Sequence, residues 1–103
     1  MQKRNLNFEW DLAKARSNWL KHKITFDSAI AAFLDPLAVT GSDDDYSDDE
    51  DRWITVGQSP NGQLVLVVHT WQESEGGAEL VRIISARRPT ARETRRYREG
   101  TSG

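Results

Sequence analysis

The strongest β-strand signal of the chain is Leu64-Val65-Leu66-Val67-Val68-His69-Thr70-Trp71. Its β-branched residues favour extended backbone, and a continuous apolar run is typical of a central strand that is covered on both faces. A turn signal, Pro60-Asn61-Gly62, precedes it, and a second turn is expected from Ser74 to Gly77. The run therefore predicts the central strand of an antiparallel sheet.

The segments that precede the first turn and follow the second turn are also expected to be extended. We expect strands at Arg52–Gly57 and Leu80–Ala86, and a short edge strand at Leu37–Thr40. A further short extended candidate is Phe8-Glu9-Trp10. The three main strands and the edge strand predict a three- to four-stranded antiparallel sheet.

Two helices are expected before the sheet. Asp11 is a suitable N-cap for a helix that runs to about His22. The apolar face of this helix is expected to comprise Leu12, Ala15, Trp19 and Leu20. Thr25 or Asp27 can cap a second helix, which Asp35-Pro36 ends because proline disfavours a helical residue before it. The residues expected to pack inward from it are Ala29, Ile30, Ala32, Phe33 and Leu34.

A third helix is expected after Pro89. Thr90 is its predicted N-cap, and Glu93 at the third helical position completes a capping box. The order helix, helix, strands, helix predicts an α+β fold, and residues 1–103 are expected to form one domain.

Composition narrows the class of protein. The 103 residues are 37% hydrophobic and 29% charged, which is typical of a globular chain. Disulfides, thiolate zinc sites and cysteine nucleophiles are excluded because there is no cysteine. No apolar run approaches the ~18 residues of a membrane span, and the N-terminus lacks the apolar stretch of a signal peptide. We therefore expect a soluble cytoplasmic protein that makes no use of a membrane.

The net charge of −2 conceals a strong segregation of charge. Seven of the 16 acidic residues fall between Asp43 and Asp51, and seven of the 14 Lys and Arg residues are arginines between Arg82 and Arg98. Arginine forks onto phosphate oxygens and stacks on bases. The cationic end of the chain therefore favours a polyanionic partner, nucleic acid above all, or an acidic protein.

Several short motifs occur in an order that resembles the BrnT family of bacterial toxins, whose fold is related to RelE-type ribonucleases. They are Phe8-Glu9-Trp10-Asp11, Lys14-Ala15, Asn18, Lys21-His22, Phe26, Phe33-Leu34-Asp35-Pro36-Leu37, Glu50-Asp51-Arg52-Trp53, Gly57, Arg82-Ile83-Ile84-Ser85-Ala86-Arg87, Glu93 and Tyr97. The chain departs from the family pattern at Lys23, where glycine is usual, and at Tyr46, where a histidine is often found. A left-handed helix cap at residue 23 would cost a non-glycine residue up to ~1 kcal/mol.

The resemblance implies a toxin of a type II toxin–antitoxin system that cleaves RNA. Its implied partner is a ribbon-helix-helix antitoxin of the BrnA kind, in an assembly of two toxins with two antitoxins. Operator DNA would be bound only through the antitoxin complex.

Cleavage of RNA without a metal needs a group that removes the 2′-hydroxyl proton, a group that protonates the leaving oxygen, and cations at the phosphate. Arg82 is the first candidate for the phosphate, because a charge within an apolar strand needs a reason. Arg87 is ranked below it, since alternation along a strand predicts opposite faces for the two arginines. Glu50 and Arg52 could act as a pair that orients the arginine, or as an ordinary surface ion pair.

His22 and His69 are the only histidines, and histidine is the side chain that titrates near neutral pH. Both are candidates for proton transfer. The alternative for His22 is a helix-end residue that interacts with the helix dipole, and the alternative for His69 is a packed residue bonded to the backbone.

Five residues are candidates for substrate binding: Trp10, Lys21, Arg87, Arg88 and Tyr97. The aromatic rings could stack on unpaired bases or pack in the core. Lys21 and the arginines of the C-terminal helix could contact RNA or antitoxin, or be solvated surface charges.

No metal or cofactor is expected. An EF-hand starting at Asp43 would need glycine at position 48 and glutamate at position 54, where the chain has Asp48 and Ile54. Two alternatives to the ribonuclease remain. One is an inactive binding module that serves as partner of a DNA-binding repressor, and the other is a stand-alone nucleic-acid-binding protein.

Overall fold

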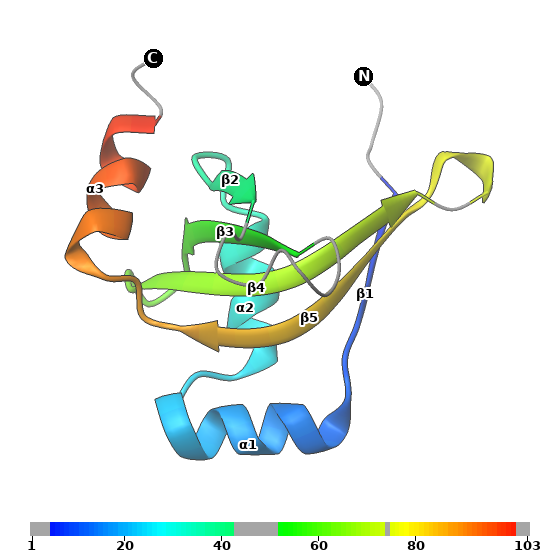
Figure 1. Ribbon diagram of the computed structural model, residues 1–103, viewed down its shortest axis with the longest axis horizontal. Coiled ribbons are helices and arrows are strands. Elements are labelled where there is room, and N and C mark those ends of the chain that lie inside the picture. The colour runs from blue at the N-terminus through cyan, green and yellow to red at the C-terminus, as the bar shows by residue number, and fades with distance from the viewer. Residues whose placement is uncertain (1–4, 43–51, 74, 101–103) are drawn as a thin grey trace.

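A five-stranded mixed sheet in the order β1-β5-β4-β3-β2 organises the chain (Figure 1). The computed structural model describes residues 5–42, 52–73 and 75–100. The elements are β1 (Leu6–Glu9), α1 (Leu12–His22), α2 (Phe26–Phe33), β2 (Val39–Ser42), β3 (Trp53–Gln58), β4 (Leu64–Glu73), the 3-10 turn η2 (Glu75–Gly77), β5 (Glu79–Arg87) and α3 (Ala91–Gly100). The predicted α+β class, the two N-terminal helices and the C-terminal helix are confirmed.

The prediction of a purely antiparallel sheet of three or four strands was wrong in two respects, because the sheet has five strands and is mixed. Strands β2 to β5 are antiparallel, but β1 pairs in parallel with β5, in a register that joins Leu6 to Glu79 and Glu9 to Arg82. A parallel partner so far away along the chain has no turn between the strands to signal it. The short candidate at Phe8 is therefore the end of an edge strand, and β4 lies at the centre as expected.

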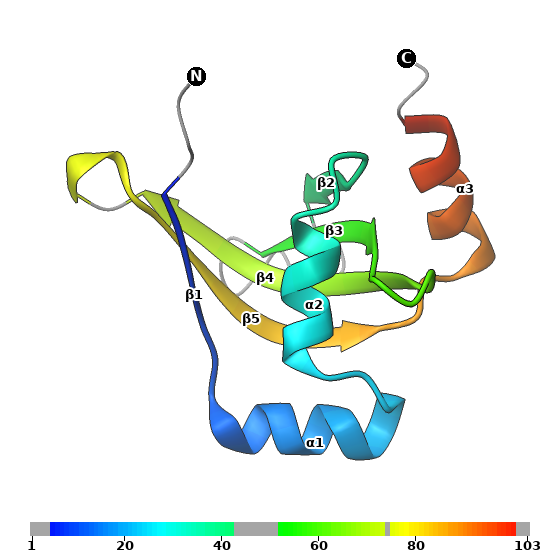
Figure 2. The ribbon, with the colours of Figure 1, turned by 180° about the vertical axis from the view of Figure 1, so that it is seen from behind.

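The helices cover the two faces of the sheet unequally. Helix α2 crosses one face, where it lies behind the strands in Figure 1 and in front of them in Figure 2. The core on this face joins Phe26, Ala29 and Ala32 of α2 to Val65, Val67 and Ile83 of the sheet. On the opposite face, Tyr97 of α3 packs against a smaller cluster that contains Val56, Leu66 and Val68. Part of that second face is therefore left for a pocket.

Each helix begins after a residue that the sequence offers as its N-cap, and of the two candidates for α2, Thr25 and Asp27, Thr25 is the cap. Asp11 accepts a hydrogen bond from the Ala13 N–H at 2.7 Å, and Thr25 accepts one from Ser28 at 3.1 Å. The capping box of α3 forms in both directions, from the Thr90 N–H to Glu93 at 2.8 Å and from the Glu93 N–H to Thr90 at 3.2 Å.

The apolar face expected for α1 does not pack. Leu12, Trp19 and Leu20 are all exposed, and only Ala15 joins the core. The buried contact is made by Asn18, whose Nδ2 donates to the Ala86 carbonyl at 2.9 Å while its Oδ1 accepts from the Ala86 N–H at 2.9 Å. A polar clasp on the backbone of β5 therefore holds α1, because an amide can complete the hydrogen bonds of a strand segment that has no neighbour there.

The connection from α1 to α2 has a left-handed cap at residue 23, a conformation that is unfavourable for a non-glycine residue. Lys23 has φ 57°, and its N–H donates to the Trp19 carbonyl at 2.9 Å.

Leu34, expected to pack inward from α2, is exposed because it is the C-cap, where the chain leaves the helix. Gly57 of β3 allows a close approach to α2, since a Cβ there would lie 1.9 Å from the Ala32 carbonyl oxygen.

A β-bulge interrupts the pairing of β4 with β5. Val68 pairs with Ser85 and His69 pairs with Ile83, so Ile84 is one residue extra on β5. Ile83 and Ala86 consequently both lie in the core under α2, while Ile84, Ser85 and Arg87 line one pocket on the other face. Alternation before the bulge gives Arg82 the face of Ile84, so the expectation of opposite faces for Arg82 and Arg87 was wrong.

Among the described residues, none of the three helices has the length and apolar character needed to span a bilayer.

Candidate functional site

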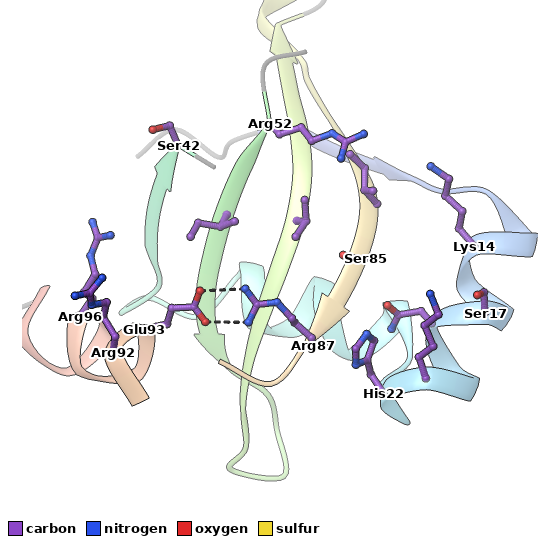
Figure 3. Close-up of a pocket in the computed structure, with 15 residues that line it drawn as sticks. Lys14, Ser17, His22, Ser42, Arg52, Ser85, Arg87, Arg92, Glu93 and Arg96 are labelled. Atoms are coloured by element: carbon purple, nitrogen blue, oxygen red, sulfur yellow. Dashed lines mark hydrogen bonds and ion pairs between the residues drawn. The ribbon is translucent and has the colours of Figure 1, made fainter. Parts of the chain in front are cut away.

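A pocket of about 700 Å³ lies on the sheet face opposite α2, between α1 and α3 (Figure 3). The sheet contributes three aliphatic side chains to it, Ile54, Val68 and Ile84, one from each of β3, β4 and β5. The other lining residues are Lys14, Ser17, Asn18, Lys21, His22, Ser42, Arg52, Ser85, Arg87, Arg92, Glu93 and Arg96. An apolar floor is thus surrounded by polar and charged walls.

The walls are strongly cationic. The lining includes six Lys and Arg residues and one histidine, and Glu93 is the single acidic residue among the described lining residues. Opposed walls supply these charges, with Arg92 and Arg96 of α3 on one side and the α1 residues on the other (Figure 3). Converging cations of this kind raise the local concentration of anions and bind phosphate.

The α1 wall follows from helical spacing. Lys14, Ser17 and Lys21 are separated by three and four residues, so their side chains leave the helix on one side. The clasp of Asn18 on Ala86 fixes which way α1 is rotated, and it turns that side toward the pocket. His22 follows in the last turn of the helix and also lines the pocket.

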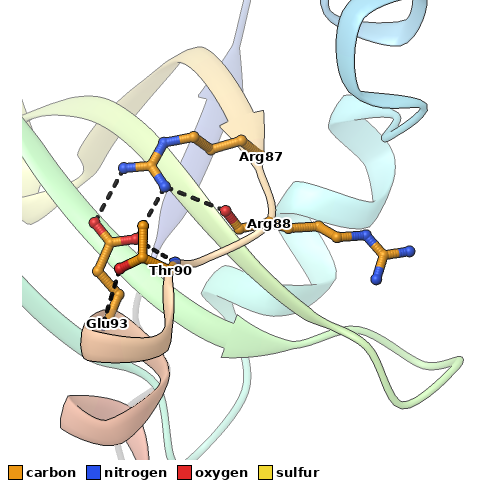
Figure 4. A network of polar contacts seen from close by, with 4 residues as sticks. All are labelled: Arg87, Arg88, Thr90 and Glu93. Atoms are coloured by element: carbon orange, nitrogen blue, oxygen red, sulfur yellow. Dashed lines mark hydrogen bonds and ion pairs between the residues drawn. The ribbon is translucent and has the colours of Figure 1, made fainter.

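Arg87 is held in place by a bidentate ion pair (Figure 4). Its Nη1 and Nη2 donate to Oε1 and Oε2 of Glu93 at 2.9 and 3.0 Å, and Nη1 also donates to the Arg88 carbonyl at 3.2 Å. The hydrogen bond from Arg87 lowers the pKa of Glu93, and the Thr90 N–H lowers it further, although partial burial acts in the opposite direction. Glu93 therefore stays ionised and orients the guanidinium.

The pocket brings together four of the residues that the sequence nominates: Lys21, His22, Arg52 and Arg87. Sequence reasoning missed Lys14, Ser17 and Glu93 as site residues, and it considered Arg92 and Arg96 only among the arginines of the C-terminal helix that could contact RNA or antitoxin. The spacing of Lys14, Ser17 and Lys21 was a signal that could have found one wall. Glu50, together with Tyr46 and the rest of the acidic segment, lies outside the described residues.

Arg82 and Arg88 are not among the residues that line the pocket. Arg82 donates to Glu9 of β1 at 2.8 Å, and both side chains are 45% exposed. Arg88 is exposed at the start of the β5–α3 connection. The ion pair with Glu9 gives the charge of Arg82 a structural reason at the sheet edge.

His69 belongs to the core. It is fully buried, its Nε2 lies 2.7 Å from Thr55 Oγ1, and its Nδ1 lies 3.1 Å from the Thr70 carbonyl oxygen. Burial lowers its pKa to about 4, although the hydrogen bond with Thr70 favours the charged form. With no exposed surface, this ring has no access to a substrate, and its packing against Phe33 is the role that the structure supports.

The two nominated aromatic residues also pack within the protein. Trp10 contacts Phe26 edge to face, with ring centroids 5.8 Å apart. The hydroxyl of Tyr97 donates to Asp35 Oδ2 at 2.6 Å, and burial together with this bond raises the pKa of Tyr97 to about 12. Tyr97 therefore fastens α3 to the end of α2 and lies outside the main pocket.

Metal ligands do not gather in the part of the chain that the structure describes, where no group of three or more His, Cys, Asp or Glu side chains is suited to hold an ion. Among the described residues, the lining of the pocket supplies guanidinium, ammonium, imidazole, hydroxyl and amide groups and the carboxylate of Glu93. This set fits a ligand that carries phosphate and an apolar or aromatic part.

The fold and its pocket define a small α+β protein with a cationic pocket that is suited to an anionic ligand. A family model described as the ribonuclease toxin BrnT of type II toxin–antitoxin systems matches residues 10–93. The chain belongs to this family, and the resemblance drawn from its sequence motifs is confirmed. A search of the curated proteins found no match.

Proposed function

We propose that this chain is a toxin that cleaves RNA within the pocket between α1 and α3, without the help of a metal ion. The single observation that carries the proposal is the convergence of six cationic side chains and one histidine over an aliphatic floor. Membership of a family of ribonuclease toxins supports it. RNA as the substrate would make the cytoplasm its place of action.

The reaction is an internal transesterification. The 2′-oxygen of one nucleotide attacks the adjacent phosphorus, the bond from phosphorus to the 5′-oxygen breaks, and a 2′,3′-cyclic phosphate and a 5′-hydroxyl result. His22 is the imidazole of the pocket and accepts the 2′-hydroxyl proton. The departing 5′-oxygen takes a proton from solvent water, and the protonated His22 gives its proton back to the solvent, since His22 and the wall around it are exposed.

Arg87 is the central phosphate ligand in this proposal. A guanidinium that is already oriented by Glu93 loses little freedom when it binds an oxyanion, and preorganised charge is the form that stabilises a transition state best. Lys21 beside His22, and Arg52 across the floor, supply further positive charge as it builds on the phosphate. Arg82 is left out, because its partner is Glu9 and it does not line the pocket.

The aliphatic floor would receive a base or ribose of a single strand. Single-stranded RNA can turn its bases outward, and flat apolar surfaces accept them. Ile54, Val68 and Ile84 carry no hydrogen-bonding side-chain atoms that could read a base edge. The floor therefore favours contact with any base.

The antitoxin side of the proposal rests on the family. Type II systems pair the toxin with a protein antitoxin. We propose a ribbon-helix-helix antitoxin, two copies of which bind two toxins and attach the complex to operator DNA.

The test is incubation of the purified chain with a single-stranded RNA in excess chelator, with Arg87→Ala as the matched inactive control. Undiminished cutting that disappears in the control supports the proposal. Cutting that stops in chelator contradicts the metal-independent mechanism. RNA binding without cutting at any protein concentration supports instead an inactive partner of a repressor.

A further inference from the structure

Helix α1 exposes an apolar stripe that nothing in the described chain covers. Leu12 is 76% exposed, Leu20 66% and Trp19 46%. With Arg16 between them, these residues occupy positions i, i+4, i+7 and i+8, which form one continuous side of a helix. Contiguous exposed apolar side chains of this kind mark a contact surface.

The stripe is separate from the other two sides of α1. Asn18 faces β5, and Lys14, Ser17 and Lys21 line the pocket. At 100° per residue, the centre of the stripe near Leu12 and Arg16 lies roughly 150° from the direction of Lys21. A partner could therefore cover the stripe without entering the pocket.

Charge identifies the kind of partner. The whole of α1 contains no acidic residue, and its first turn lacks the acids that the helix dipole favours there. Arg16 lies within the stripe, and Lys23 places its Nζ 5.5 Å from the centroid of the Trp19 ring. A symmetric contact with a second copy of this chain would bring these like charges together.

We infer that the α1 stripe, defined as Leu12, Arg16, Trp19 and Leu20, docks an acidic amphipathic helix supplied by the antitoxin. The inference rests on the proposed function only in taking an antitoxin as the partner. Leucines of the incoming helix would pack between Leu12, Trp19 and Leu20, and its carboxylates would pair with Arg16 and Lys23. Tryptophan and arginine are the side chains that most often dominate such contacts.

The test measures binding of a purified ribbon-helix-helix antitoxin of the BrnA kind to purified toxin variants by calorimetry. Leu12→Ser combined with Leu20→Ser should weaken binding by ~10- to 100-fold, as loss of a contact centre does. The matched control is Leu34→Ser combined with Leu37→Ser. These leucines are also exposed, at 53% and 54%, but they lie at and after the C-terminal end of α2 and not on α1. The control should bind like the unaltered chain.

The role of charge is tested separately with Arg16→Glu. This variant should weaken antitoxin binding at least as strongly as the double variant Leu12→Ser/Leu20→Ser does, whereas Arg16→Lys should retain binding. The inference would be overturned if the Leu12→Ser/Leu20→Ser variant bound the antitoxin with the affinity of the unaltered chain. It would also be overturned if the control variant lost as much affinity as this double variant. A dimer of the isolated toxin that the serine pair converts to a monomer would assign the stripe to a second copy instead.

RNA cleavage by the same variants keeps this inference apart from the proposed function. The stripe variants should cut RNA at the unaltered rate, since none of the substituted residues lines the pocket. A chain that never cuts RNA but loses antitoxin binding with the stripe would refute the nuclease and leave the docking surface intact.

Discussion

Arg87 and Glu93 are joined by two parallel hydrogen bonds, of 2.9 and 3.0 Å, that link the last residue of β5 to the first turn of α3. The same Glu93 carboxylate accepts the Thr90 N–H that begins the helix. One side chain thereby both starts α3 and aims an arginine across the pocket. By contrast, Arg82 and Glu9 form a pair through one bond of 2.8 Å at the exposed sheet edge.

Replacement of Glu93 should affect both stability and activity. We expect Glu93→Gln to lower the free energy of unfolding by about 1 kcal/mol, because it weakens the capping box. RNA cleavage should also slow, since Arg87 loses its orientation. Urea unfolding and a cleavage assay measure the two effects. The control Glu9→Gln should change the unfolding free energy by under ~0.5 kcal/mol and leave cleavage alone; equal behaviour of the two variants would contradict the role given to Glu93.

The arginines of β5 should differ in importance. The sequence ranks Arg82 first, whereas the pocket contains Arg87. We expect Arg87→Ala to reduce the rate of RNA cleavage by ~10²-fold, the usual effect of losing one preorganised stabilising group. Arg82→Ala should retain growth arrest and cleavage. If Arg82→Ala abolishes cleavage while its fold survives, the active site extends to the sheet edge and includes Arg82.

His22 should be needed for chemistry more than for binding. We expect His22→Gln to lower the cleavage rate by ~10²- to 10⁴-fold, the range that general acid–base catalysis contributes. The affinity for an uncleavable 2′-deoxy analogue should change little, because the cations of the pocket remain. A cleavage rate that keeps its size and its pH dependence in this variant would remove His22 from the mechanism.

His69 should make the fold sensitive to acid. Its pKa is lowered from 6.5 to about 4 by burial, so the unfolded chain binds a proton that the folded chain does not. Stability from the neutral ring is fully present above pH 6.5 and is lost as the pH falls from 6.5 toward 4, by on the order of 3 kcal/mol in all. Urea unfolding at pH 7.5 and 4.5 measures the loss. In His69→Gln the difference between the two pH values should be smaller, and an unchanged difference would show that other groups cause it.

The approach of β3 to α2 should tolerate no added atom. A Cβ at Gly57 would lie 1.9 Å from the Ala32 carbonyl oxygen, which is backbone and cannot turn away. Gly57→Ala should therefore lower the unfolding free energy by about 1–3 kcal/mol, the cost of overpacking. Gly41→Ala is the control, since its Cβ would meet nothing nearer than an Arg96 nitrogen at 3.9 Å. Equal melting temperatures for the two variants would contradict this contact.

Local signals in the sequence predicted the helices and the main strands well. The caps at Asp11, Thr25 and Thr90 act within three residues of where they stand, so they could be read from neighbouring positions. The parallel pairing of β1 depends on a partner at Glu79, and no short-range pattern carries such information.

The site was predicted only in part for the same reason. His22, Lys21, Arg52 and Arg87 were nominated by residue type, but their convergence depends on Asn18, which rotates α1 through a bond to Ala86, 68 positions away. The exposed stripe of α1 shows the limit of periodicity: it predicts that apolar residues share a side of the helix, and it does not say whether this chain or another one covers them.

The extra residue at Ile84 decides which face of the sheet each following side chain of β5 lies on. Loss of one residue between Ile83 and Arg87 would exchange the two faces downstream, so that Arg87 would enter the core beneath α2 and Ala86 would turn outward. The backbone that Asn18 grips would shift with it. Replacement of the side chain at position 84 should therefore disturb Arg87 less than deletion of that residue, because the length of the strand decides on which face of the sheet the guanidinium of Arg87 lies.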